Sequence, residues 1–94
     1  MIRFEWDEVK NKSNFQKHGL WFEETLSVFD DPLGRVFYDR DHSHSEDRFF
    51  IVGADKRGRT LVVVHHYKES NLVIRIISAR RATKKETRFY EKRV

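Results

Sequence analysis

The second half of the chain contains two short, nearly uninterrupted apolar runs. They are Leu61–Val64 and the segment 73–77, in which Arg75 is the one charged residue. The surrounding segments, residues 59–68 and 72–79, are predicted to be strands joined by a turn at residues 69–71. A strand that is apolar at successive positions is covered on both faces for part of its length. The chain is therefore expected to build a sheet with helices packed against it.

The remaining segments supply these helices and further strands. Ile2–Trp6 alternates as a strand, and Asp7 is expected to cap a helix that ends at Gly19. A second helix is predicted from residue 22, with its end before Pro32. Strands are expected at residues 35–39 and 48–54, and a capping box of Thr83 and Glu86 begins a final helix. The predicted order is β-α-α-β-β-β-β-α, an α+β domain with an antiparallel sheet over residues 1–94.

Length and composition exclude several classes of protein. A chain of 94 residues is expected to form a single domain. The sequence contains no cysteine, which excludes a disulfide scaffold, a thiolate metal site and a cysteine nucleophile, and fits a reducing compartment. No apolar run approaches the ~20 residues of a membrane span, and the first residues do not resemble a signal peptide. A soluble, cytoplasmic protein is expected.

Charge is distributed unevenly along the chain. The formal net charge is +4, but residues 1–47 have a balance of −5 and residues 48–94 a balance of +9. A basic half on a small domain favours a polyanionic partner, either nucleic acid or an acidic protein segment. A solvated basic helix whose cations complement the helix dipole would give the same pattern.

The strand Arg75-Ile-Ile-Ser-Ala-Arg80-Arg81 is the first candidate for chemistry. Strict alternation predicts Arg75, Ile77, Ala79 and Arg81 on one face, with Arg80 on the other. Guanidinium groups bind phosphate through two parallel hydrogen bonds and stabilise charge that develops in phosphodiester cleavage. The structural alternative is that Arg80 or Arg81 pairs with acidic residues of the first half.

Histidines provide the second set of candidates. His65 and His66 are adjacent on a strand and are predicted to face opposite sides, where either could transfer a proton in RNA cleavage or simply be partly covered. Asp39, Asp41, His42 and His44 have metal-ligand chemistry, although a solvated turn would have the same composition. No metal or other cofactor is expected.

Several of these segments together resemble the BrnT toxins. The matching residues run in order through nearly the whole chain: residues 4–7, Lys10, Asn14, residues 17–19 and 22–24, the segment from Asp41-His42-Ser43 to Glu46 and Arg48, Gly53, residues 74–80, Ala82-Thr83, and Glu86 to Tyr90. The resemblance implies a RelE-like fold and a ribonuclease toxin of a type II toxin–antitoxin pair that shuts down translation. It also implies a BrnA-like antitoxin with a ribbon-helix-helix part, a heterotetramer with that partner, and indirect contact with operator DNA.

The resemblance and the chemistry above together suggest a set of site residues. Arg48, Arg75 and Arg80 are expected to be catalytic, with His65 or His66 as a proton carrier. The remaining candidates, Lys17, His18, Arg81 and Glu86, are expected to bind substrate.

Two alternative functions stay open. One is a catalytically weak module that binds the antitoxin and acts as an operon co-repressor. The other is a stand-alone DNA binder, although no helix-turn-helix pattern is visible. Lys17 and His18 also have a purely structural explanation, because both cations complement the C-terminal end of a helix.

Overall fold

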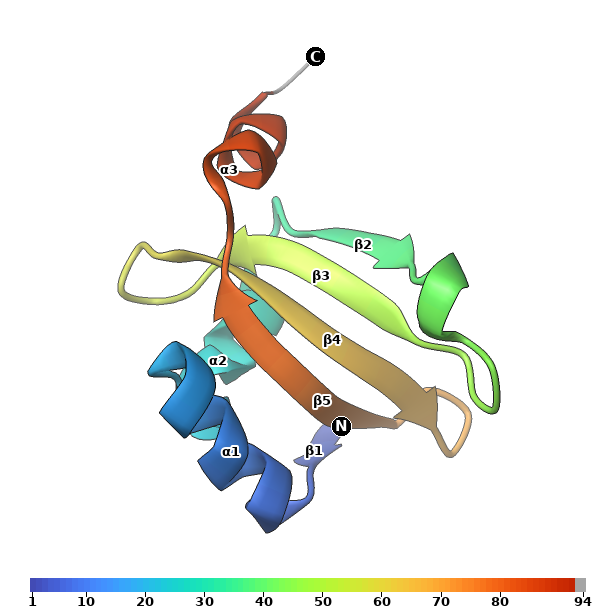
Figure 1. Cartoon of the computed structure of the whole chain (residues 1–94). Coiled ribbons are helices and arrows are strands. Elements are labelled where there is room, and N and C mark those ends of the chain that lie inside the picture. The colour runs from blue at the N-terminus through green and yellow to red at the C-terminus, as the bar shows by residue number, and fades with distance from the viewer. Residues whose placement is uncertain (93–94) are drawn as a thin grey trace.

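The two apolar runs form the centre of a five-stranded sheet. A computed structural model describes residues 1–92; residues 93 and 94, the end of the expected domain 1–94, lie outside the described part. The elements in chain order are β1 (Arg3–Glu5), α1 (Glu8–His18), α2 (Phe22–Thr25), the 3₁₀ helix η1 (Leu26–Asp30), β2 (Arg35–Tyr38), the 3₁₀ helix η2 (Arg40–His42), β3 (Phe49–Ala54), β4 (Thr60–Lys68), β5 (Val73–Arg81) and α3 (Lys84–Glu91) (Figure 1).

The sheet has the strand order β1-β5-β4-β3-β2. The pairs β2–β3, β3–β4 and β4–β5 are antiparallel, whereas β1 runs parallel to β5. The expectation of a wholly antiparallel sheet was therefore wrong at β1. Only neighbours joined by a short hairpin must be antiparallel, and β1 reaches β5 from the opposite end of the chain.

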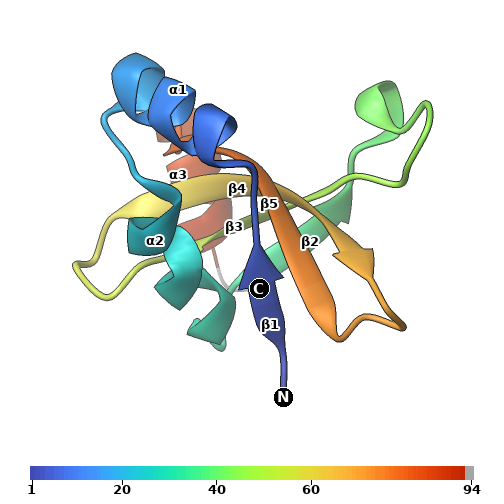
Figure 2. The same ribbon diagram turned by 90° about the horizontal axis from the view of Figure 1, so that it is seen from below.

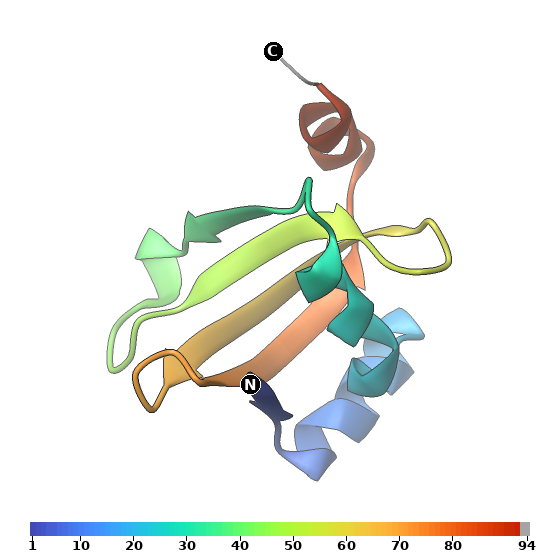
Figure 3. The ribbon, with the colours of Figure 1, turned by 180° about the vertical axis from the view of Figure 1, so that it is seen from behind.

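Helices cover both faces of the sheet, to different extents. Figure 2 shows α1 and α2 on one side of the strands, and in Figure 3 α3 lies beyond the end at which β5 finishes. The core under α1, α2 and η1 is built from strand residues together with one residue each of α2, η1 and the loop before α2: Leu20, Phe22, Val28, Ile51, Leu61, Val63, Ile74, Ile76 and Ala79. On the opposite face Tyr90 of α3 packs on Val52 and Val62.

The helix ends follow their local sequence signals. Asp7 accepts hydrogen bonds from the amides of Val9 (2.8 Å) and Lys10 (3.3 Å), and Gly19 ends α1 with a φ of 70°. The Thr83–Glu86 capping box at the start of α3 is confirmed. The expected second helix is instead a four-residue α-helix that continues as the 3₁₀ helix η1.

One extra residue in β5 changes which side chains share a face. Val64 pairs with Ser78 and His65 pairs with Ile76, so Ile77 is left without a partner on β4. This β-bulge explains why Ile76 and Ala79, three residues apart, both lie in the core under α1. The alternation predicted for residues 75–81 was therefore wrong.

Beyond this bulge the strand is also longer than expected. Arg80 and Arg81 pair with Val62 and Leu61, so β5 runs two residues past its predicted end at Ala79.

The helices are short. Within residues 1–92, none combines the length and the apolar character that crossing a lipid bilayer requires.

Candidate functional site

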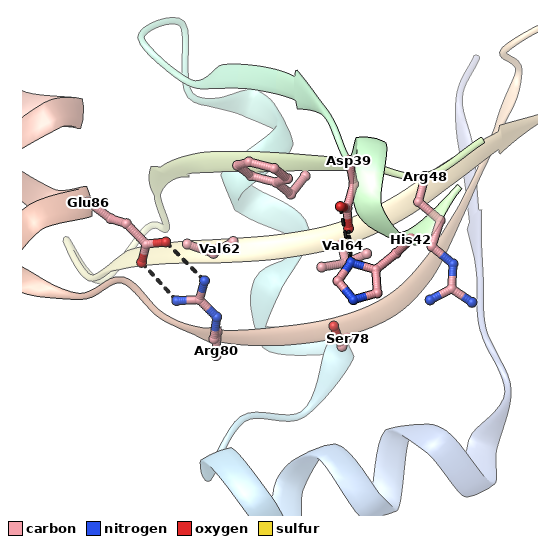
Figure 4. A pocket seen from close by; sticks show the side chains of 9 residues that line it. Asp39, His42, Arg48, Val62, Val64, Ser78, Arg80 and Glu86 are labelled. Carbon is pink, nitrogen blue, oxygen red and sulfur yellow. Dashed lines mark hydrogen bonds and ion pairs between the residues drawn. The ribbon is translucent and has the colours of Figure 1, made fainter. Parts of the chain in front are cut away.

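The face of the sheet opposite α1 is hollowed where η2 and α3 border the central strands. This hollow has a volume of about 400 Å³, and charged residues from four separate parts of the chain surround an apolar floor (Figure 4). Its lining consists of Asp39, His42, Arg48, Phe50, Val62, Val64, Ser78, Arg80 and Glu86. Three of the predicted site residues, Arg48, Arg80 and Glu86, are therefore brought together.

A histidine–carboxylate pair stands on the η2 side of the hollow. His42 Nδ1 lies 3.1 Å from both carboxylate oxygens of Asp39, and the Asp39 side chain is mostly covered, with 18% exposed. Ser43 holds the segment in place, because its hydroxyl donates to the Asp39 carbonyl (2.6 Å) and accepts from the Arg48 amide (2.9 Å). With Nδ1 bound to the carboxylate, the other ring nitrogen of His42 is the one available to exchange a proton.

An arginine–carboxylate pair stands on the α3 side. Arg80 donates from both terminal nitrogens to Glu86, at 2.8 and 2.9 Å. The hydrogen bonds from Arg80 lower the pKa of Glu86 to about 2, and the same pair raises the pKa of Arg80. Glu86 also accepts from the Thr83 amide, so the helix cap and the ion pair fix one carboxylate.

Arg48 brings a second guanidinium group to the hollow. Its Nε is buried and has no hydrogen-bond partner within residues 1–92, and its ion pair with Glu46 is long, at 3.8 Å. Within residues 1–92 the two terminal nitrogens of Arg48 form no hydrogen bond either, so these donors are available for an anionic ligand.

Arg75 and His66 lie on the same face of the sheet, outside the lining of the hollow. They are directly opposite each other on β5 and β4. Arg75 pairs with Glu5 at 2.8 Å, and the hydrogen bonds of Lys68 and Arg75 hold the pKa of Glu5 below its usual value. His66 lies 3.4 Å from Glu46. Because of the bulge, Arg75 shares this face with Arg80, contrary to the prediction.

His65 faces the other way and is fully buried. Its ring packs against Phe29, and its nitrogens lie 3.0 Å from the Val63 carbonyl and 3.2 Å from the Tyr67 hydroxyl. Burial lowers the pKa of His65, so the ring is held neutral in the core. In this position it has no access to a substrate.

The other predicted substrate-binding residues lie away from the hollow. Lys17 and His18 are at the C-terminal end of α1, beside β5, and Arg81 is exposed at the end of that strand. Sequence reasoning, in turn, missed the pairing of His42 with Asp39, which it treated only as possible metal ligands. The sequence signal for this pair was that His42 follows Asp39 by three residues, a spacing that one 3₁₀ turn brings within hydrogen-bonding distance.

The part of the chain that the structure describes contains no group of three or more His, Cys, Asp or Glu side chains arranged to hold a metal ion. The polar and charged groups that line the hollow are the two arginines, Glu86, Ser78 and the Asp39–His42 pair.

Comparison with known proteins gives two matches that agree. Residues 6–86 match the family model described as the ribonuclease toxin BrnT of type II toxin–antitoxin systems. The crystal structure of the Brucella abortus ribonuclease toxin BrnT is similar in fold, with a TM-score of 0.63 and 27% sequence identity, and the match covers 89% of this chain and 100% of that one. No curated protein sequence matches the chain.

Proposed function

This chain belongs to the BrnT family, the ribonuclease toxins of type II toxin–antitoxin systems, and we propose that it cleaves RNA in the hollow between His42 and Arg80. One observation carries the choice of site. A histidine oriented by a carboxylate and two guanidinium groups line the same hollow. These are the groups needed to move a proton and to stabilise charge on a phosphate.

The proposed reaction is attack of a ribose 2′-hydroxyl on the neighbouring phosphorus. His42 takes the 2′ proton on its free ring nitrogen while its Nδ1–H donates to Asp39. The bond between the 2′ oxygen and phosphorus forms, the bond to the 5′ oxygen breaks, and solvent supplies the proton of the leaving oxygen. Arg48 and Arg80 stabilise the charge that builds on the phosphate oxygens, so the residues need no metal ion for this role.

Arg80 must exchange its partner during this reaction. A phosphate offers the same two-point acceptor geometry as the Glu86 carboxylate, which now occupies the guanidinium group. Glu86 in this scheme positions Arg80 before the substrate arrives, which refines the expectation that Glu86 itself binds substrate.

We further propose a RelE-like fold, action in the cytoplasm and arrest of translation through the RNA that is cut. A BrnA-like antitoxin would neutralise the toxin in a heterotetramer and link it to operator DNA. The basic balance of the second half of the chain, +9, supports both an RNA substrate and an acidic partner segment.

One observation favours the second candidate function, a catalytically weak module that binds the antitoxin. Both terminal nitrogens of Arg80 are engaged by Glu86, at 2.8 and 2.9 Å, so a phosphate gains access only by displacing a carboxylate. A module of this kind would bind its partner without cleaving RNA.

The test is cleavage of a purified RNA in EDTA by the wild-type protein, His42→Ala and Arg80→Ala. A matched control is His44→Ala, which changes an exposed histidine of the same segment that does not line the hollow. We expect the His42 and Arg80 variants to lose at least about 100-fold in rate. Folding of each variant is checked by its thermal unfolding.

Two results would reject the proposal. Full activity of a folded His42→Ala protein would remove the proton carrier from the mechanism. No cleavage by the wild-type protein, together with normal growth of a bacterial host that expresses it, would favour the binding module.

A further inference from the structure

A second hollow lies between α1 and the edge of β5. Its volume is about 180 Å³, and its polar lining includes Lys10, Ser13, Lys17 and His18 of α1 together with Ser78 of β5. Ser78 also lines the first hollow. The two hollows therefore adjoin at this residue, on either side of β5.

The position of α1 beside β5 follows from one buried side chain. Strand β1 pairs with β5 only as far as Arg75, so the rest of that edge is left for another partner. Asn14 of α1 binds this free edge. Its Oδ1 accepts a hydrogen bond from the backbone N–H of Ala79 and its Nδ2 donates to the backbone carbonyl of Ala79, both at 2.9 Å. Residues at helical spacings from Asn14, namely Lys10 and Lys17, are thereby placed along the same edge.

The charge of this groove differs from that of its surroundings. Residues 1–47 have a balance of −5, yet α1 has three lysines against one glutamate. Among the described residues, no acidic side chain lines the groove. Within residues 1–92, Lys10 and Lys17 form no ion pair, in contrast to Arg75 and Arg80, which are both bound to carboxylates.

We propose that this groove binds RNA phosphates next to the one that is cleaved. The single strand would leave the hollow at Arg80, cross β5 at Ser78 and continue along α1, with Lys10 and Lys17 bound to successive phosphates. The inference rests on the proposed function, because it takes the first hollow as the site of cleavage. In this proposal the groove between α1 and β5, whose described lining has no acidic side chain, binds the RNA backbone, which carries one negative charge for each nucleotide.

The test measures binding separately from cleavage. The probe is a fully 2′-O-methylated RNA octamer, which lacks the attacking hydroxyl and cannot be cut by the proposed reaction. Its affinity is measured over a range of salt concentrations for the wild-type protein and for the double variant Lys10→Ala/Lys17→Ala. The double variant Lys12→Ala/Lys56→Ala is the control, since it removes the same charge from residues that line neither of the two hollows.

Loss of two phosphate contacts lowers the slope of log affinity against log salt by about 1.4, at about 0.7 for each phosphate of a single strand. We expect that change, with several-fold weaker binding, in the Lys10/Lys17 variant and a much smaller change in the control.

Equal salt slopes for the two double variants would overturn the groove proposal even if His42→Ala abolishes cleavage. The groove would also be reassigned if the Lys10/Lys17 variant lost affinity for the antitoxin and none for the octamer. Conversely, a folded His42→Ala protein that still cuts RNA would reject the proposed mechanism and leave the binding result intact.

Discussion

Replacement of Asn14 by aspartate tests the contact that joins α1 to the sheet. Asn14 as a whole residue is 5% exposed, and its Nδ2 donates to the carbonyls of Leu20 and Ala79, each at 2.9 Å. Its Oδ1 accepts from the Ala79 amide at the same distance. Aspartate has nearly the same shape and keeps the acceptor oxygen. It replaces Nδ2 by a second oxygen, so both hydrogen bonds that Asn14 donates are lost.

The expected loss of stability can be estimated from these bonds. Each buried carbonyl left without its donor costs about 1–3 kcal/mol, so two cost about 2–6 kcal/mol. Protonation of the new carboxyl restores one donor, so its pKa in the folded state is raised above the value of about 3.9 in the unfolded chain. The variant therefore loses stability relative to wild type as pH rises above about 4 and through that raised pKa. The expected loss of about 2–6 kcal/mol is a large part of the free energy of unfolding of a small domain, which is typically about 5–15 kcal/mol.

Urea unfolding followed by tryptophan fluorescence measures this loss between pH 5 and 8. Gln16→Glu is the control, because it makes the same amide-to-carboxylate change on an exposed position of α1 and should alter the free energy of unfolding by less than about 0.5 kcal/mol. An Asn14→Asp protein within about 1 kcal/mol of wild type at pH 8 would refute the role assigned to this side chain.

Three further predictions concern the ion pair, the buried histidine and a helix end. Glu86→Gln keeps the helix cap but removes the ion pair with Arg80, which should cost about 1 kcal/mol at pH 7 after allowance for solvent screening. The pKa of Glu86 is lowered to about 2 in the fold, so this contribution is lost as pH falls from about 4.5 towards 2; a gap in unfolding free energy that stays constant in acid would contradict the assignment. His65→Phe should leave RNA cleavage unchanged in folded protein. Burial lowers the pKa of His65, so the wild-type protein loses stability as pH falls below about 6.5, and acid unfolding curves should show less of this loss in the variant. Gly19→Ala should destabilise α1 by about 1 kcal/mol in thermal unfolding, because φ is 70° there while the space for a Cβ is open.

The local parts of the fold could be predicted from the sequence. The cap at Asp7, the left-handed residue Gly19 and the Thr83–Glu86 box depend on residues within a few positions of one another. The direction of β1 could not be predicted in this way. It depends on which strand edge remains free after β4 has paired with β5, and no neighbouring residue carries that information.

The guanidinium groups of the candidate site could be predicted from the sequence, and the proposed proton carrier could not. Arg48 and Arg80 were identified by their charge and by resemblance, and both line the hollow. His42 was passed over because a segment rich in Asp, His and Ser is also what a solvated turn contains. The position of His42 at the hollow depends on Ser43, whose hydroxyl donates to the Asp39 carbonyl and accepts from the Arg48 amide.

The bulge at Ile77 changes which arginines share a face of the sheet, and the sequence does not reveal it. In a regular strand Arg75 and Arg80 would lie on opposite faces, and no single ligand could approach both. In a regular strand with one buried face, polar and apolar residues alternate, which fixes the residues that face the core. Ile76 and Ile77 are adjacent and both apolar, so hydrophobicity alone does not decide which of them faces the core. Tertiary packing decides between the two arrangements. Ile76 and Ala79 both pack in the core under α1, and the Asn14 side chain hydrogen-bonds to the backbone of Ala79 at the strand edge. The buried contact of α1 with β5 thus helps to determine that the arginines share the face on which the hollow lies.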